Sequence, residues 1–359
     1  MKSVFALFLI FLLCNYSFAQ TSFTITGKIT NETLGTPMVA ASVFAQNTTL
    51  GTATDSEGNF KLTLPNGGYD LIISFTGYKT EQKRITTADA GEKLEIKLKE
   101  KEKELEVVSI KSSNEVIDGM EKYGQFFKDE FIGKTANGKK CSINNPEALH
   151  FFFSKKKNRL KITATEPLII KNEALGYNIK YDLDSFTHEY KTALSTYSGY
   201  PLYENMIGDT IQMQEWKTAR QEAYKGSMLH FMRSVFNKTL LEEQFEVQFV
   251  VKVFGKDEGI KLKDIYSSFN YIKYDSTNTV EILPNQPEVG ILYLAAKPSA
   301  AYLIENADEP KDFKFSILSL KSKESIVIEQ NGFFYDQNDI VSSGYWAWNK
   351  VAEQLPYDF

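Results

Sequence analysis

Cysteine and histidine are scarce in this 359-residue chain, which has two cysteines and three histidines. If a leader that contains Cys14 is removed, Cys141 stands alone and no disulfide can form within the chain. Zinc sites need several ligands at set spacings, yet His150, His188 and His230 lie neither in a His-Glu-x-x-His motif nor three residues before a Glu. The sequence therefore predicts neither a metal site nor another cofactor.

Signatures of other catalytic classes are also missing. The Gly-x-Ser-x-Gly elbow of serine hydrolases and the two glycine-rich phosphate-binding loops do not occur. Cys141 and a distant histidine would formally make a nucleophile pair, but a buried structural cysteine is the commoner case. A carboxylate pair for glycoside cleavage has no short motif, so that chemistry stays open.

Neither sign of charge dominates: 41 Lys and Arg stand against 46 Asp and Glu, a formal net charge of -5. Without a basic cluster in the sequence, nucleic acid is not expected as a partner. After residue 13 no apolar run approaches the ~18 to 20 residues that a membrane-spanning helix needs, so no transmembrane span is predicted. The apolar fraction of 42% is ample for two cores.

The first 19 residues have the features of a signal peptide. A positive start is followed by a continuous apolar run, Val4 to Leu13, and by Ser17-Phe18-Ala19, a small-x-small cleavage pattern. Lipidation of Cys14 is the alternative, but Leu13 stands where such signals usually have Gly, Ala or Ser. We therefore expect an exported protein, located in the periplasm or associated with the outer membrane.

Residues 22–98 have the pattern of a small β-sandwich. Apolar and polar residues alternate from Phe60 to Leu64 and from Tyr69 to Phe75, as in strands buried on one face. Asp55 with Gly58 fits a type I turn, and Asn66-Gly67-Gly68 predicts a hairpin with positive φ. The alternation and the turns together predict several short strands.

Gly27, the Asp55-x-x-Gly58-x-Phe60 motif and Gly77-Tyr78 together resemble the carboxypeptidase-regulatory-like domain. The resemblance implies a prealbumin-like, seven-stranded sandwich that serves as an accessory module and does not hydrolyse peptides. In Gram-negative envelopes, modules of this family often precede the plug of TonB-dependent receptors or a β-rich domain of unassigned role. Fold resemblance alone does not give a function.

A charged linker is predicted at 99–112, because Lys and Glu alternate from Lys97 to Glu106 in a run that no core could absorb. Leu105 to Ile110 resembles the extended segment that follows this module in TonB-dependent receptors, and we expect a linker strand there. Residues 113–359 predict one α+β domain with an antiparallel β-meander. They resemble the domain of unknown function that accompanies the module in envelope proteins, on motifs such as Glu166-Pro167-Leu168-Ile169-Ile170 and the ending Ser343-Gly344-Tyr345-Trp346.

The expected elements of this second part are two helices, a set of short strands and a final helix. The helices are predicted at Val116 to Phe131, capped by Asn114, and at Glu215 to Asn237, with a short one at Ser343 to Leu355. The strands are predicted at 149–153, 160–165, 168–171, 176–186, 188–194, 197–203, 245–254, 266–274, 291–294, 301–304, 313–320 and 325–328.

One face of the helix predicted at Glu215 to Asn237 is the candidate ligand-binding site. At about 100° per residue, one arc carries an indole, a guanidinium, a phenol, a hydroxyl and an imidazole. These groups belong to Trp216, Arg220, Tyr224, Ser227 and His230. Such a face could bind an anion or a sugar; the alternative is that it packs on the meander, with Arg220 and His230 satisfying strand-end carbonyls.

These observations favour a non-enzymatic, exported accessory protein of the cell envelope that binds a protein or a glycan. Its sandwich would be a scaffold or interaction module, and recognition would use strand edges or exposed aromatic residues. The alternative is a hydrolase that acts on a surface polysaccharide or peptide.

Overall fold

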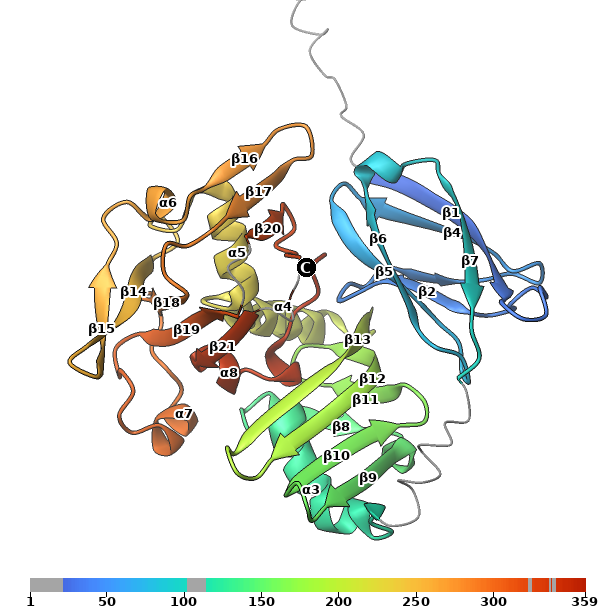
Figure 1. Cartoon of the computed structure of the whole chain (residues 1–359), viewed down its shortest axis with the longest axis horizontal. Helices are drawn as coiled ribbons and strands as arrows, with labels where there is room; N and C mark the ends of the chain where they lie inside the picture. Colours follow the sequence, from blue (N-terminus) through green and yellow to red (C-terminus); the bar gives the residue numbers. More distant parts are fainter. Residues whose placement is uncertain (1–21, 102–113, 322–324, 336, 338–339) are drawn as a thin grey trace, which may run out of the picture.

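The computed structural model describes residues 22–101, 114–321, 325–335, 337 and 340–359 (Figure 1). Its fold class is the predicted one: an N-terminal β-sandwich followed by a mixed part with antiparallel sheets and few helices. The expected leader, Cys14 and the linker strand at Leu105 to Ile110 lie outside the described residues. No helix of the described part is long and apolar enough to cross a membrane.

The sandwich consists of a three-stranded sheet, in the order β4-β1-β7, and a four-stranded sheet, in the order β3-β2-β5-β6. Its strands are β1 (Ser22–Asn31), β2 (Ser42–Ala45), β3 (Gly51–Ala53), β4 (Asn59–Pro65), β5 (Gly68–Ser74), β6 (Glu81–Thr86) and β7 (Lys93–Leu98). Every pair is antiparallel except β1 with β7.

The sandwich motif has a direct structural reason. The phenyl ring of Phe60 lies over Gly27, its partner across the β1–β4 ladder, and a Cβ at Gly27 would come within 2.6 Å of this ring and of the Leu94 carbonyl. The predicted turn is present: a carboxylate oxygen of Asp55 accepts hydrogen bonds from the backbone of Glu57 and Asn59. Gly27 and Phe60 therefore belong to the motif because they pack against each other in the core of the sandwich.

The hairpin predicted at Asn66-Gly67-Gly68 is wrong. Gly67 does have a positive φ of 148°, but β4 pairs with β1 and β5 pairs with β2 and β6. The turn therefore carries the chain from one sheet of the sandwich to the other. Local turn chemistry determines the backbone angle, whereas the strand partners depend on the whole sandwich.

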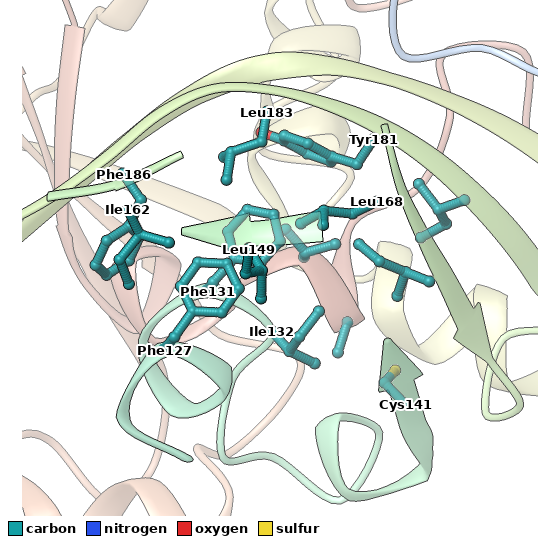
Figure 2. Packing of buried hydrophobic residues seen from close by; sticks show 14 of the residues in the cluster. Phe127, Phe131, Ile132, Cys141, Leu149, Ile162, Leu168, Tyr181, Leu183 and Phe186 are labelled. Atoms are coloured by element: carbon teal, nitrogen blue, oxygen red, sulfur yellow. The ribbon is translucent and has the colours of Figure 1, made fainter. Parts of the chain in front are cut away.

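Residues 119–224 form a second unit, in which a helix covers one face of a six-stranded sheet. Its elements are α3 (Gly119–Phe131), β8 (Cys141–Ile143), β9 (Leu149–Ser154), β10 (Arg159–Ala164), β11 (Leu168–Asn172), β12 (Tyr177–Glu189), β13 (Leu194–Asn205) and α4 (Thr210–Tyr224). Figure 2 shows Phe127 and Phe131 of α3 among sheet residues such as Ile162 and Leu168.

The long strand β12 organises this sheet. Along one edge it pairs with β11 and then with β10, and along the other edge it pairs with β13. The sequence predicts two separate strands here, 176–186 and 188–194. That prediction is wrong: Thr187 and His188 continue the same ladder, and the side chain of His188 is buried against Phe126 and Tyr190.

A third unit follows, with its own hydrophobic cluster. It contains a five-stranded sheet, in the order β15-β14-β18-β19-β21, and a three-stranded sheet, in the order β16-β17-β20. The strands are β14 (Phe245–Val253), β15 (Lys256–Lys261), β16 (Ile272–Tyr274), β17 (Thr279–Ile282), β18 (Glu288–Tyr293), β19 (Lys314–Leu320), β20 (Ile326–Glu329) and β21 (Ile340–Gly344). Its helices are α5 (Met228–Asn237), α6 (Ile265–Ser268), α7 (Ala300–Glu305) and α8 (Tyr345–Trp348).

Four predicted elements in residues 210–355 are wrong in type or extent. The expected strand 301–304 is the helix α7, whose N-cap Ser299 accepts a hydrogen bond from Tyr302. The expected strand 266–274 begins as α6 and ends as β16. The expected final helix begins as β21 and continues as α8. The expected helix Glu215 to Asn237 is two helices, α4 and α5, as described below.

The sandwich packs against the rest of the chain through the outer face of its four-stranded sheet (Figure 1). Period-2 alternation would leave Asp70 and Ile72 of β5 exposed, yet both are buried. Thr48 forms a parallel bridge with Leu202 of β13, and Thr80 donates a hydrogen bond to Asp182 of β12. Both faces of β5 are therefore covered.

Candidate functional site

The predicted site residues lie on two helices. Helix α4 ends at Tyr224, and α5 starts after Ser227, whose hydroxyl caps it by accepting from the His230 amide. Gly226 lies between them with a φ of +73°, and a Cβ there would be 2.5 Å from the Tyr293 ring. The single helical face expected from the sequence is therefore broken.

Trp216 and Arg220, one turn apart on α4, hold the turn between β11 and β12. The indole nitrogen of Trp216 donates to the Glu173 carbonyl at 2.9 Å. The guanidinium of Arg220 donates to the Leu175 carbonyl at 2.6 Å and to the Gly176 carbonyl at 2.9 Å. It also lies 3.8 Å from the centroid of the Tyr177 ring, a cation–π distance. This pair attaches an otherwise largely exposed helix to the sheet.

Tyr224, Ser227 and His230 come together where the second and third units meet. The Tyr224 ring centroid lies 4.6 Å from that of His230, which is buried against Phe245. Nδ1 of His230 accepts from the Gly226 amide at 3.0 Å, so the imidazole carries its proton on Nε2 and donates it to a Glu243 carboxylate oxygen at 3.0 Å.

The structure thus brings the five residues into two groups. Each group makes contacts inside the chain, and the Arg220 contacts with turn carbonyls agree with the packing alternative. His230 binds a helix-junction amide and Glu243, where that alternative expected strand-end carbonyls. A ligand-binding role for the five residues stays a prediction.

His230 predicts a dependence of stability on pH. Burial is the main reason that its pKa lies below the usual value, and the hydrogen bond to Glu243 partly opposes that shift. Below pH ~6.5 the unfolded histidine takes up a proton that the folded one resists. We expect the free energy of unfolding to fall by at most ~1.4 kcal/mol per pH unit as the pH drops through this window. Urea titrations at pH values from 7.5 to 5.5 measure this change in the free energy of unfolding.

The matched variant for this measurement is His230→Gln, which lacks the titrating group. It should be less stable at every pH, because the amide and carboxylate partners of the imidazole lose their bonds. Its stability should also decline less with acidification than that of the wild type. Equal slopes for the two proteins would show that another group governs the pH response.

Cys141 is a structural residue. Its thiol is buried in the core of the second unit, and burial raises its pKa to about 12 (Figure 2). Its sulfur contacts the Asn137 carbonyl at 3.4 Å. A thiol with such a pKa is protonated at neutral pH and is a poor nucleophile.

A polar cluster between the sandwich and the third unit was not predicted. The Glu329 carboxylate, at the end of β20, accepts a hydrogen bond from the Tyr335 hydroxyl and lies against Gly68 of β5. The Arg84 guanidinium lies 3.8 Å from the Tyr335 ring centroid and pairs with Asp70 at 2.7 Å. Burial raises the pKa of Glu329. No sequence signal links these groups, because docking brings them together.

A groove lies between the sandwich and the six-stranded sheet, and the sequence did not predict it. The sandwich contributes Phe75 and Tyr78, whose ring centroids are 5.5 Å apart, and the sheet side contributes Glu166, Lys180 and Asp182. Its rings and charged groups could contact a polar ligand. The groove exists only while the two units are docked.

Comparisons with known proteins bear on the N-terminal part. Residues 25–110 match the family model described as CarboxypepD_reg-like domain, so the resemblance of the sandwich to that family is confirmed. TonB-dependent receptor SusC from Bacteroides thetaiotaomicron is 32% identical over 117 residues, which are 33% of this chain and 10% of the receptor. The chain thus matches only a tenth of this curated relative's length.

Solved structures give weaker similarities. A DUF3823 family protein from Bacteroides ovatus is 11% identical, with 52% of this chain and 82% of that chain covered and a TM-score of 0.18. A DUF3823 family protein from Parabacteroides merdae is 10% identical, with 54% and 85% covered and a TM-score of 0.17. Scores this low carry no argument about the second and third units.

Proposed function

We propose that this protein is an exported, non-catalytic accessory protein of the cell envelope that binds another envelope protein or a glycan. The observation that carries the proposal is the CarboxypepD_reg-like sandwich, together with 32% identity to a TonB-dependent receptor over 117 residues. The signal peptide predicted at 1–19 agrees with export. The domain boundaries predicted at 22–98, 99–112 and 113–359 belong to the same proposal.

Docking of the sandwich determines which surfaces are available to a partner. One sheet face of the sandwich is covered by the second and third units, and the backbone of Tyr357 donates to the Asn47 carbonyl at 2.7 Å. The Asp358 carboxylate accepts from the Thr49 amide at 2.9 Å. Partners would therefore meet the outer face of the sandwich or the far side of the third unit.

We place the contact with a protein partner at the tip of the β14–β15 hairpin. Phe254 is fully exposed there and has a φ of +49°, with Gly255 beside it at +80°. Asn and Gly favour such a two-residue turn, whereas a bulky side chain is rare at positive φ. An exposed aromatic residue at a strained position costs stability, and an anchoring role at an interface accounts for its presence.

The test is crosslinking and recovery of partners from intact cells that express the wild type or Phe254→Asn. Asparagine tolerates the left-handed backbone, so the variant should fold at least as stably while losing most of the recovered envelope partner. Ile207→Asn is the matched control, because Ile207 is also almost fully exposed but lies before α4. Unchanged recovery of every partner with Phe254→Asn would contradict this placement.

The alternative function has a distinct outcome. A hydrolase that acts on a surface polysaccharide or peptide would turn over its substrate when purified, and a single point change would abolish the activity. That result would overturn the binding proposal.

A further inference from the structure

The outer face of the three-stranded sheet carries four lysines and several threonines. It lies on the side of the sandwich away from the covered sheet (Figure 1). The outward residues of its strands are half-buried or exposed, while their neighbours fill the core. From β1 these residues are Ser22, Thr24, Thr26, Lys28 and Thr30; from β4, Asn59, Lys61, Thr63 and Pro65; and from β7, Lys93, Glu95 and Lys97.

The strand register aligns the outward residues of β1, β4 and β7 in rows across the sheet. Thr26 pairs with Lys61 on one side and with Lys93 on the other, so one row reads Lys-Thr-Lys across the sheet. Adjacent strands are ~4.8 Å apart and each residue rises ~3.3 Å, so Lys61 and Lys93 lie roughly 10 Å apart and Lys93 and Lys97 roughly 13 Å apart, measured at Cα. The lysines thus form a spaced array on an open sheet.

The array is positive on a chain with a net charge of -5. Glu95 is the one acidic residue among these outward positions, and it lies opposite Lys28. Hydrogen bonds from Asn59 and Glu57 are the main reason that the pKa of Asp55, in the turn before β4, lies below its usual value, and Lys28 lowers it only slightly further. Within the described part of the chain, Lys61, Lys93 and Lys97 have no carboxylate within 4.0 Å.

Protection of sheet edges explains only part of this pattern. Lysines on edge strands such as β4 and β7 discourage edge-to-edge pairing of sheets. Lys28 lies on the central strand β1, where such protection has no purpose, and the threonines of β1 alternate with core residues along the whole strand.

We propose that this face binds a linear acidic polysaccharide, with the lysines pairing with its anionic groups. The threonine hydroxyls would accept hydrogen bonds from sugar hydroxyls, since Thr24 and Thr63 already bond to each other and Thr26 donates to the Glu92 carbonyl. The inference rests on the proposed function and specifies its glycan. Lysine is depleted in the cores of protein interfaces, which disfavours a protein partner. Apart from Pro65 at one strand end, the face offers no apolar side chain to enter a lipid surface. An open array of weak contacts suits a polymer that engages several of them together.

The test uses the full chain and two probes of similar length, polygalacturonate and neutral dextran, in titrations at low and at physiological salt. We expect salt-sensitive binding of polygalacturonate and none of dextran. Lys61→Gln combined with Lys93→Gln should weaken binding about fivefold to tenfold, because each exposed ion pair contributes modestly. Lys83→Gln combined with Lys217→Gln is the control: it makes the same charge change at exposed positions on β6 and α4.

Three results would overturn the inference. The first is no binding of polygalacturonate, and the second is an equal loss in both double variants, which would show that net charge alone governs the binding. The third is lysine-dependent binding to vesicles containing anionic lipid with no binding to the polymer. None of these three results would change the recovery of envelope partners that depends on Phe254. The proposed function is therefore tested separately from the polysaccharide inference. Unchanged thermal melting of the double variants shows that the fold is intact.

Discussion

Replacing Gly176 by alanine is expected to lower the free energy of unfolding by about 3 kcal/mol or more. Gly176 has a φ of +69°, and a Cβ there would be 2.2 Å from one atom of the Trp216 indole and 2.6 Å from another. The ring cannot move aside freely, because its nitrogen is bonded to the Glu173 carbonyl. Urea unfolding of the two proteins measures the difference.

Gly35→Ala is the matched control, because it separates backbone strain from the clash. Gly35 has nearly the same φ, +68°, and nothing lies within 4 Å of the position of its Cβ. Its substitution should therefore cost only about 1 kcal/mol, the penalty for a left-handed backbone. If the two variants lose equal stability, the indole does not hold the β11–β12 turn. That result would contradict the packing role of Trp216 and Arg220.

The sandwich was predictable because its signals are local. Alternation over Phe60 to Leu64 and the Asp55 turn each depend on residues within a few positions of one another. Which strands pair is not local, and the wrong hairpin at 66–68 shows this limit. The burial of Asp70 and Ile72 was equally inaccessible, because the residues that cover β5 lie far away in the chain.

The sequence does contain a signal for the break between α4 and α5, but the helical periodicity of the apolar residues continues across it. Gly226 is a strong helix terminator, and Ser227 is a favoured N-cap immediately before an apolar stretch. The helix α7 had a similar signal in Ser299. By contrast, no sequence signal pointed to the Glu329 cluster or to the lysine array. Tertiary packing brings the residues of the Glu329 cluster together, and the strand register aligns the lysines.

The second large effect concerns docking of the sandwich, and a double-mutant cycle isolates it. The position of a Cβ at Gly68 is 2.2 Å from a Glu329 carboxylate oxygen and 2.9 Å from the Tyr335 hydroxyl. Gly68→Ala should therefore displace Glu329 and cost about 2 to 3 kcal/mol. Glu329→Ala is also destabilising, because it leaves the Tyr335 hydroxyl without its acceptor.

In the Glu329→Ala background the added methyl group meets no carboxylate, so Gly68→Ala should cost about 1 to 2 kcal/mol less than in the wild type. Gly27→Ala provides the control cycle, because its Cβ would meet Phe60 and the Leu94 carbonyl inside the sandwich, far from Glu329. That pair should be additive within ~0.5 kcal/mol. Additivity in both cycles would mean that the Glu329 carboxylate does not contact the Cβ introduced at position 68 of β5. Coupling in the first cycle alone would show that one buried carboxylate joins the sandwich to the third unit.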